Sequence, residues 1–247
     1  MTTSSEKVAF ITGANRGIGF ETAKGLGALG ITVVLGARDI TKGEAAASQL
    51  KALGYNAEAI HYDANQSESV ETVYEYLNKH YGRLDILVNN AGINQEQLVG
   101  SNNSSTVDID TIQQTFHSNL FAVIELTQKL LPLIKKAPAG RIVNLSSILA
   151  SLTLHSMPDS PIEPAKAFAY NASKTALNVY TVHLANELRD TNVKVNSAHP
   201  GWVKTELGGE NAPMEVADSY KTSVQLATLD STGANGGFFH QGESLPW

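Results

Sequence analysis

Short apolar runs alternate along the chain with longer segments in which apolar residues recur every three to four positions. The apolar runs cover residues 8–11, 31–36, 57–61, 84–88, 141–145 and 193–198. The run at residues 8–11 is uninterrupted, as expected for a strand covered on both faces of a parallel sheet. Helical periodicity is found in residues 18–29, 43–53, 67–81, 109–136, 170–189 and 213–229. The alternation predicts an α/β fold, with one doubly wound parallel sheet flanked by helices.

Local signals mark the ends of several of these elements. Gly54 and Gly82 are placed to end helices, Ser67 to cap one, and Pro132 lies near the end of the longest. Residues 95–106 are polar and predict a surface loop, and residues 237–240 predict a last edge strand. Since no linker, repeat or low-complexity tract interrupts the pattern, we expect residues 1–247 to form a single domain.

The first strand runs directly into a turn that carries Gly13, Gly17 and Gly19. A turn between a strand and a helix N-terminus lets the backbone approach a pyrophosphate, whose charge the helix N–H groups and dipole favour. The spacing is GxxxGxG rather than the common GxGxxG, and three glycines alone are equally compatible with a tight turn before a core helix. The strand–turn–helix context favours the dinucleotide site.

Polar residues follow the carboxyl ends of six predicted strands, where doubly wound sheets bind their ligands. They are Asn15 and Arg16, Arg38, Asp63, Asn89 to Gly92, Ser146 and Ser147, and His199 to Gly201. Tyr170 and Lys174 begin the following helix and share one of its faces, because they are four positions apart. One ligand cleft can gather all of these side chains.

These motifs resemble, in order, those of the short-chain dehydrogenase/reductase family. The matching stretches are TGANRGIG (12–19), NNAG (89–92), Asn119, IVNLSS (142–147), YNASK (170–174) and PGWVKT (200–205). The resemblance implies a Rossmann-type, NAD(P)-dependent oxidoreductase domain over nearly the whole chain. The final stretch, GGFFHQGESLPW, resembles a carbonyl-reductase-like branch.

The resemblance also implies which residues act. The implied catalytic set is Asn119, Ser147, Tyr170 and Lys174. The residues expected to bind the coenzyme are Gly13, Asn15, Arg16, Gly17, Ile18, Gly19, Arg38, Asp63, Asn90, Ala91, Gly92, Tyr170, Lys174, Pro200, Gly201, Val203 and Thr205.

The residue types fit the reduction of a carbonyl group. The coenzyme supplies a hydride and the protein supplies a proton. Tyr170 donates that proton as the acid in reduction and accepts it as the base in oxidation. A neighbouring Lys174 ammonium favours the phenolate and can hold the nicotinamide ribose. The Ser147 hydroxyl can bind the substrate oxygen as charge develops there. By family resemblance, Asn119 holds a water that resupplies the proton.

Each of these residues, taken alone, has a structural interpretation. A Tyr–Lys pair one turn apart is commonly packing, a serine at a strand end is commonly a cap, and Asn119 is an amide that can bond backbone. Asp63 suits an adenine amino group and a helix cap about equally. We expect Asn89 to bond backbone in the sheet. The seven histidines show no metal-ligand spacing, so no metal is expected, and His199 is expected to be structural.

The coenzyme is expected to be NADP(H). NAD-selective sites place an acidic residue after the second strand to bind the ribose, and here that place holds Ala37. Arg38 and Arg16 can instead grip a 2′-phosphate. Asp39 is the alternative, because a small shift of register brings it to the ribose.

Charge and composition limit the classes of partner that we expect this protein to bind. A net charge of −6 gives no support to nucleic-acid or anionic-membrane binding, and no apolar run approaches a membrane span. The chain has no cysteine, which excludes disulfides and fits a cytoplasmic protein, and MTTSSEK lacks a signal-peptide core.

In relatives, helices matching residues 109–136 and 170–189 often pair with their copies across a two-fold axis, and the second helix is apolar around much of its circumference. We therefore expect a homodimer or homotetramer.

The predicted function is an NADPH-dependent oxidoreductase that reduces a ketone or aldehyde to an alcohol, or the reverse, on a small-molecule substrate. The alternative is a non-catalytic dinucleotide-sensing protein on the same scaffold. A sensor need not retain Asn119, Ser147, Tyr170 and Lys174 together, which favours the enzyme.

Ser147 and Tyr170 are 23 positions apart, about twice the separation typical of the family that the chain resembles. Pro158, Pro161 and Pro164 within residues 148–169 predict an extended, partly rigid loop. We expect this loop to form a wall of an apolar substrate pocket, opposite residues 206–212, although it could instead cover a helix face or an oligomer contact. The side chains expected to line the pocket are Leu152, Leu154, Met157, Ile162 and Phe168.

Overall fold

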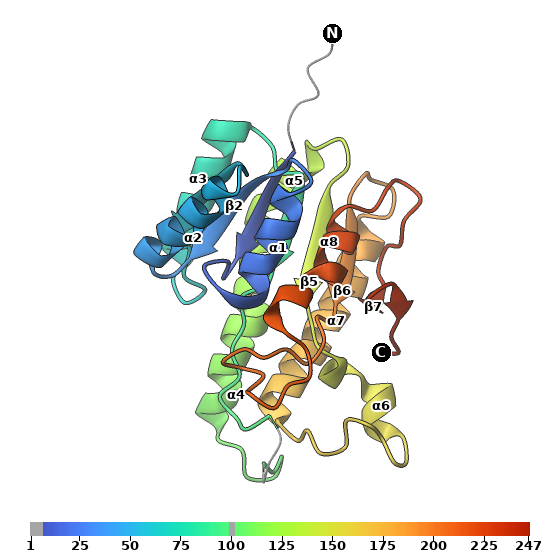
Figure 1. Cartoon of the computed structure of the whole chain (residues 1–247). Coiled ribbons are helices and arrows are strands. Elements are labelled where there is room, and N and C mark those ends of the chain that lie inside the picture. Colours follow the sequence, from blue (N-terminus) through green and yellow to red (C-terminus); the bar gives the residue numbers. More distant parts are fainter. Residues whose placement is uncertain (1–6, 99–101) are drawn as a thin grey trace.

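A computed structural model describes residues 7–98 and 102–247 (Figure 1). Residues 99–101 of the predicted loop at 95–106 lie outside the described residues. So do residues 1–6, which make up most of the stretch expected to lack a signal-peptide core.

The core of the molecule is one sheet with the strand order β3-β2-β1-β4-β5-β6-β7-β8. Its strands are β1 Val8–Thr12, β2 Thr32–Ala37, β3 Ala57–His61, β4 Ile86–Asn89, β5 Arg141–Leu145, β6 Lys194–Ala198, β7 Phe238–His240 and β8 Glu243–Ser244. All neighbours pair in parallel except β7 and β8, which are antiparallel. The predicted doubly wound parallel sheet is confirmed. The expectation that residues 237–240 end the sheet is wrong, because β8 lies outside β7.

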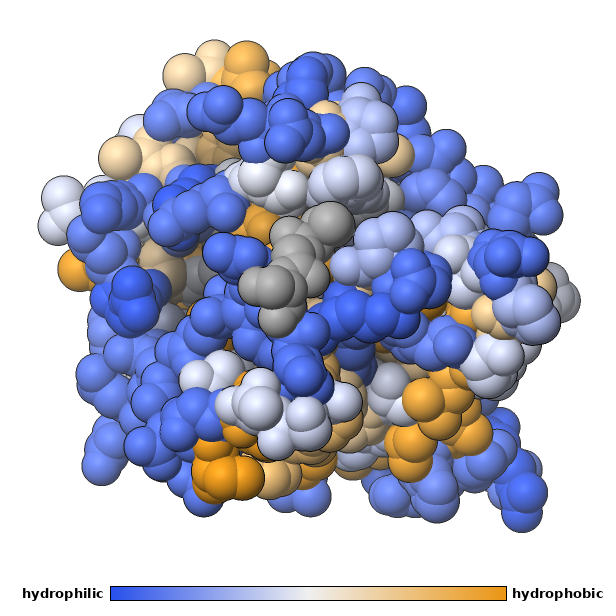
Figure 2. Space-filling view, turned by 90° about the horizontal axis from the view of Figure 1, so that it is seen from below, coloured by the Kyte–Doolittle hydropathy of each residue, from blue (hydrophilic) through white to orange (hydrophobic). Residues whose placement is uncertain are grey.

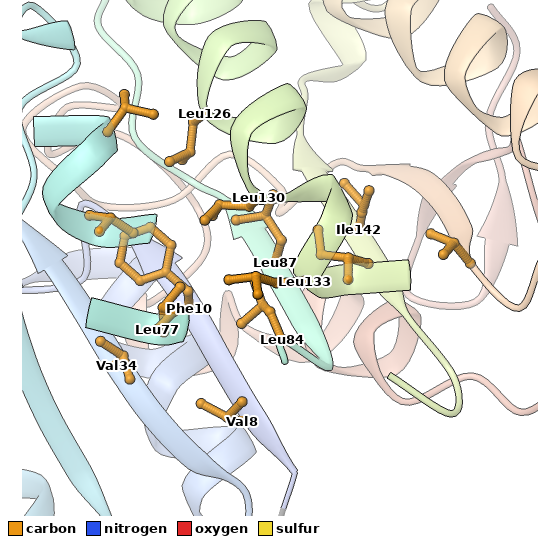
Figure 3. Packing of buried hydrophobic residues seen from close by; sticks show 14 of the residues in the cluster. Val8, Phe10, Val34, Leu77, Leu84, Leu87, Leu126, Leu130, Leu133 and Ile142 are labelled. Carbon is orange, nitrogen blue, oxygen red and sulfur yellow. The ribbon is translucent and has the colours of Figure 1, made fainter. Parts of the chain in front are cut away.

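Helices cover both faces of the sheet. They are α1 Gly17–Gly27, α2 Ile40–Ala52, α3 Ser67–Tyr81, α4 Ile109–Phe116, α5 Ala122–Lys135, α6 Leu152–Ser156, α7 Phe168–Glu187 and α8 Lys221–Ala227. Alternate residues of a strand face opposite sides. Val8 and Phe10 therefore pack with α3, α5 and α7, whereas Ala9 and Ile11 pack with α1, α2 and α8. Figure 3 shows Phe10 and Leu87 of the sheet beside Leu126, Leu130 and Leu133 of α5.

Two predicted helices differ in extent, and a third differs only in its cap. Helix α2 begins at Ile40, earlier than expected, because the Asp39 carboxylate caps it by accepting from the Lys42 N–H at 3.2 Å. Residues 213–229 form only a 3-10 turn, Val216–Asp218, and α8. Helix α3 has the predicted bounds and ends at Gly82 as expected, but its N-cap is Gln66 rather than Ser67.

The long helix expected at residues 109–136 is divided. A π-helical turn, His117–Phe121, separates α4 from α5. Such turns are frequent at functional sites, and this one carries Asn119. The Asn119 side chain bonds to groups of other segments, Ile93 and Ser173.

Two absences apply to the described part of the chain alone. None of its helices combines the length and apolar character needed to cross a bilayer. Within the same residues, no three histidine, aspartate or glutamate side chains gather in a way that could hold a metal ion.

Candidate active site

The glycine turn and the segment after β4 are held together at the carboxyl end of the sheet. The Thr12 hydroxyl accepts from the N–H groups of Asn90 and Ala91 at 3.0 and 2.9 Å. The Asn90 amide donates to the Thr12 carbonyl at 2.7 Å. Gly13 has φ +62°, and a Cβ there would lie 3.2 Å from both Asn90 Nδ2 and Ala91 Cα. The turn therefore requires glycine at this position.

Helix α1 starts beside this turn with free backbone donors. Its N-cap, Arg16, makes no side-chain cap bond, and its first turn holds no acidic residue. The N–H groups and the positive end of the helix dipole are thus available to an anion.

A cavity of about 1310 Å³ runs along the carboxyl ends of the strands. All seventeen residues that the sequence assigned to coenzyme binding line it, and so does the predicted catalytic Ser147. Figure 2 views the molecule from this end, where hydrophilic residues predominate and hydrophobic ones form separate patches. Further residues that line the cavity were not predicted from the sequence, among them Lys42, Tyr62 and Trp202.

One part of the cavity is basic. Arg16, Arg38 and Lys42 all line it. The Arg16 Nη1 atom forms a 2.5 Å ion pair with Glu206 Oε2 on the opposite wall. Lys42 could have been found from its position four residues after Arg38, at the start of a helix.

The structure weakens the alternative in which Asp39 binds the ribose. Although Asp39 lines the cavity, one carboxylate oxygen caps α2 and the other pairs with Lys42 Nζ at 3.4 Å. The backbone hydrogen bond from Lys42 is the main reason that the pKa of Asp39 lies below its usual range. One Asp39 oxygen is thus committed to the cap of α2.

Tyr170 and Lys174 enter the cavity from the first two turns of α7. Lys174 Nζ donates to the Leu145 carbonyl at 2.8 Å and lies 5.8 Å from the centre of the Tyr170 ring. Burial raises the pKa of Tyr170 to about 12, against a smaller lowering by a hydrogen bond from Ser147. Burial also lowers the pKa of Lys174 to about 8. Burial is thus the largest influence on both groups, and it disfavours the charged form of each.

Asn119 is not one of the residues that line the cavity. Its side chain accepts from the Ile93 N–H at 2.8 Å and donates to the Ile93 carbonyl at 2.9 Å and to the Ser173 hydroxyl at 3.0 Å. A Cβ at Gly92 would lie 3.1 Å from Asn119 Oδ1 and 3.3 Å from Lys174 Nζ. Gly92 thus allows Asn119 and Lys174 to approach each other.

Ser147 stands at the end of β5, before the 3-10 turn Ile148–Ala150. Its Oγ accepts from the Leu149 N–H at 3.2 Å. His199 Nδ1 accepts from the Ile148 N–H, also at 3.2 Å, so this turn is held from β6 as well. Burial, aided by His240, lowers the pKa of His199 to about 3, which keeps the ring neutral at physiological pH.

Two residues of uncertain role now have defined contacts. Asp63 does not cap α3, because its oxygens accept from the Asn65 N–H at 3.0 Å and the Gln66 amide at 3.1 Å, and it lines the cavity. The Asn89 amide donates to Thr127 Oγ1 at 3.1 Å and Asn144 Oδ1 at 2.8 Å. Asn89 therefore joins side chains, where the sequence argument expected it to bond backbone.

The long segment after Ser147 lines part of the cavity, but mostly with other side chains than expected. Of the five predicted lining residues, only Ile162 lines it, and the other lining residues of the segment are Ile148, Leu149, Pro161, Pro164 and Ala165. Leu152, Met157 and Phe168 are exposed, and Leu154 packs beside a cluster that contains Ile162 and Tyr170. Glu206, Leu207 and Gly208 also line the cavity. The segment is not wholly extended, since it contains the short helix α6.

Known proteins resemble this chain over most of its length. The family model described as short chain dehydrogenase matches residues 7–216. Carbonyl reductase (NADPH) 1 of Mus musculus is 30% identical, with 99% of both chains covered. The structure of salutaridine reductase from Papaver somniferum aligns with a TM-score of 0.82 at 26% identity, over 95% of this chain and 99% of that one. A short chain dehydrogenase from Burkholderia cenocepacia J2315, in complex with NADP, aligns with a TM-score of 0.79 at 29% identity and 95% coverage of both.

Proposed function

The chain belongs to the short chain dehydrogenase family and is an NADP-dependent oxidoreductase of carbonyl compounds, and we propose that Tyr170 is its proton donor. The observation that carries this proposal is the convergence of Ser147, Tyr170 and Lys174 on the same cavity as Arg16 and Arg38.

The residues around the cavity fit NADP(H). The glycine turn leads into the free N–H groups at the start of α1, which can bind a pyrophosphate. Arg16, Arg38 and Lys42 bring positive charge for a 2′-phosphate. When bound, the coenzyme supplies the hydride that the reduction of a carbonyl carbon requires.

The protein supplies the proton and stabilises charge. With a pKa of about 12, Tyr170 holds its proton at neutral pH and can give it to the substrate oxygen. The Ser147 hydroxyl donates to the same oxygen as negative charge develops on it. Lys174 has a pKa of about 8 and is therefore largely protonated at pH 7. Its ammonium group adds a positive charge 5.8 Å from the centre of the Tyr170 ring. Asn119 orders the segment at Ile93 beneath these groups.

The substrate is a small carbonyl compound with a substantial apolar part. The side chains that line the cavity beyond the coenzyme-binding residues are largely apolar and include Leu98, Ile148, Leu149, Ile162, Trp202 and Leu207. Such walls favour apolar ketones and aldehydes over small polar ones.

The chain forms a homodimer or homotetramer through α4, α5 and α7. Phe121 and Val179 are large apolar side chains with 54% and 53% of their surface exposed, on the elements expected to pair. Light scattering at micromolar concentration should give a mass above that of the monomer. A monomer alone would reject this assembly.

A steady-state assay with NADPH and a panel of apolar and polar carbonyl compounds tests the function. We expect turnover with NADPH, and loss of turnover in Tyr170→Phe. Coenzyme binding without turnover of any compound would favour the dinucleotide sensor. Full activity of the Tyr170→Phe variant would contradict the proposed proton donor.

A further inference from the structure

Helix α7, which carries Tyr170 and Lys174, begins without a cap of its own. Its N-cap is Ala167, which makes no side-chain hydrogen bond to the helix, and its first turn contains no acidic residue. The first N–H groups of a helix need partners, and negative charge there is stabilising. The sequence around Ala167 supplies neither.

A residue from a distant segment fills this role. Glu96, in the loop after β4, accepts a hydrogen bond from the Tyr170 N–H through Oε2 at 3.1 Å. A carboxylate that accepts from an N–H group at a helix N-terminus forms a charge-assisted bond, roughly twice as strong as a neutral one. Glu96 is half-buried, and its bond is made to the backbone of the proposed proton donor itself.

The short segment between Ile93 and Glu96 therefore connects two residues of the predicted catalytic set. At one end both backbone groups of Ile93 bond to Asn119, at 2.8 and 2.9 Å. At the other end Glu96 holds Tyr170. The Asn94 side chain accepts from the Glu96 N–H at 3.0 Å, which shapes the turn between them. Leu98 then packs on the cluster that includes the Tyr170 side chain.

We propose that Glu96 is a positioning residue for Tyr170: its carboxylate fixes the first turn of α7 and so the direction of the phenol toward Ser147. This inference rests on the proposed function. Helix ends are the least stable part of a helix, and Tyr170 is the third residue of α7. A misplacement of a reacting group by about 1 Å can cost on the order of a hundredfold in rate.

The test compares Glu96→Ala with Glu96→Gln, whose amide oxygen still accepts from the Tyr170 N–H. We expect the alanine variant to lose at least about tenfold in kcat while its Kd for NADPH stays within about twofold. The glutamine variant should retain kcat within about threefold of the wild type. Glu75→Ala, an exposed glutamate of α3, is the matched control and should behave as the wild type.

Two further measurements separate positioning from general destabilisation. The solvent deuterium isotope effect on kcat should rise in Glu96→Ala, because a misdirected phenol makes proton transfer slower relative to the other steps. In a double mutant with Tyr170→Phe, the loss caused by Glu96→Ala should largely disappear. If Glu96→Ala does not fold, Glu96→Asp tests the same point, since it keeps the charge but shortens the reach and should lie between the two variants.

The outcomes distinguish this inference from the proposed function. If Tyr170→Phe is inactive but Glu96→Ala has a normal kcat, Glu96 does not position Tyr170, and the proton donor stands. The inference is equally overturned if Glu96→Gln is as impaired as Glu96→Ala, or if the two losses in the double mutant simply add. An active Tyr170→Phe variant overturns the proton donor itself and the inference with it.

Discussion

The ammonium group of Lys174 lies 5.8 Å from the centre of the Tyr170 ring and donates a hydrogen bond of 2.8 Å to the Leu145 carbonyl. Both side chains are buried, and burial acts on them in opposite directions. It raises the pKa of Tyr170 to about 12 and lowers that of Lys174 to about 8. The Tyr170 phenol therefore keeps its proton at neutral pH. The Lys174 ammonium beside it loses its proton as the pH rises through about 8.

Removal of the phenol oxygen should abolish most of the activity. Tyr170→Phe keeps the ring and its packing, so we expect kcat to fall by at least roughly a hundredfold, the low end for general acid catalysis. The Kd for NADPH, measured by fluorescence titration, should stay nearly unchanged. Normal turnover would make Tyr170 a packing residue.

The rate of reduction should fall as the pH rises through about 8. Since the pKa of Lys174 lies below that of an ordinary lysine, its positive charge is lost from about pH 8 upward rather than above pH 10. A profile of kcat/KM against pH should show this decline. In Lys174→Arg the side chain stays charged, so the decline should move to higher pH even if the rate is lower. An unchanged profile in that variant would assign the decline to another group.

Arg38→Gln should weaken NADPH binding by about ten- to a hundredfold, the usual effect of losing one charge-assisted contact to a phosphate. NADH, which lacks the 2′-phosphate, should bind nearly as before, so the preference for NADPH should narrow. Lys51→Gln, near the far end of α2 and outside the cavity lining, is the control. Equal weakening of both coenzymes would show that Arg38 does not read the phosphate.

His199 should make the protein less stable in acid. Its folded pKa of about 3 lies below the value near 6.5 expected in the unfolded chain, so the unfolded state binds the extra proton between these values. The stabilisation is complete above about pH 6.5 and is lost, at up to about 1.4 kcal/mol per pH unit, as the pH falls toward 3.

Urea unfolding at several pH values measures this effect. His199→Asn, whose side-chain oxygen is an alternative acceptor for the Ile148 N–H, should flatten the dependence of the unfolding free energy on pH. His183→Asn, at an exposed site on α7, should leave the dependence as it is in the wild type. The same slope in His199→Asn and wild type would exclude His199 as its source.

Ile162→Ala should change the order in which carbonyl substrates are preferred. Ile162 lines the cavity, and Ile162→Ala removes three side-chain carbons. Since a single missing methylene in an apolar pocket changes kcat/KM by roughly ten- to two-hundredfold, substrates that contact this side chain should lose at least about tenfold. Met157→Ala, exposed on the same segment, should leave the order unchanged. Shortening Ser156 to Pro164 to a Gly-Ser link should likewise alter the order while NADPH affinity stays intact. An unchanged order in Ile162→Ala would assign the segment to packing or assembly.

The sequence alone was sufficient to predict the parallel part of the sheet and to place the candidate coenzyme-binding residues in one cleft. Strands buried on both faces are near-continuous apolar runs, so β1, β2 and β4 were visible without any tertiary information. Parallel strands bring their carboxyl ends to one edge, so residues as far apart as Gly13 and Thr205 could be assigned to a single cleft.

Only the tertiary structure decided how the site residues are held, because the groups that hold them are distant in the chain and periodicity is a local signal. The π-helical turn at Asn119 accompanies its bonds to Ile93, and Glu96 caps α7 from 74 positions away. Helix α6 forms in a proline-rich segment where the Trp247 backbone oxygen accepts from the Thr153 N–H at 2.8 Å. In each case at least one hydrogen-bond partner comes from a distant segment, which local preference cannot show.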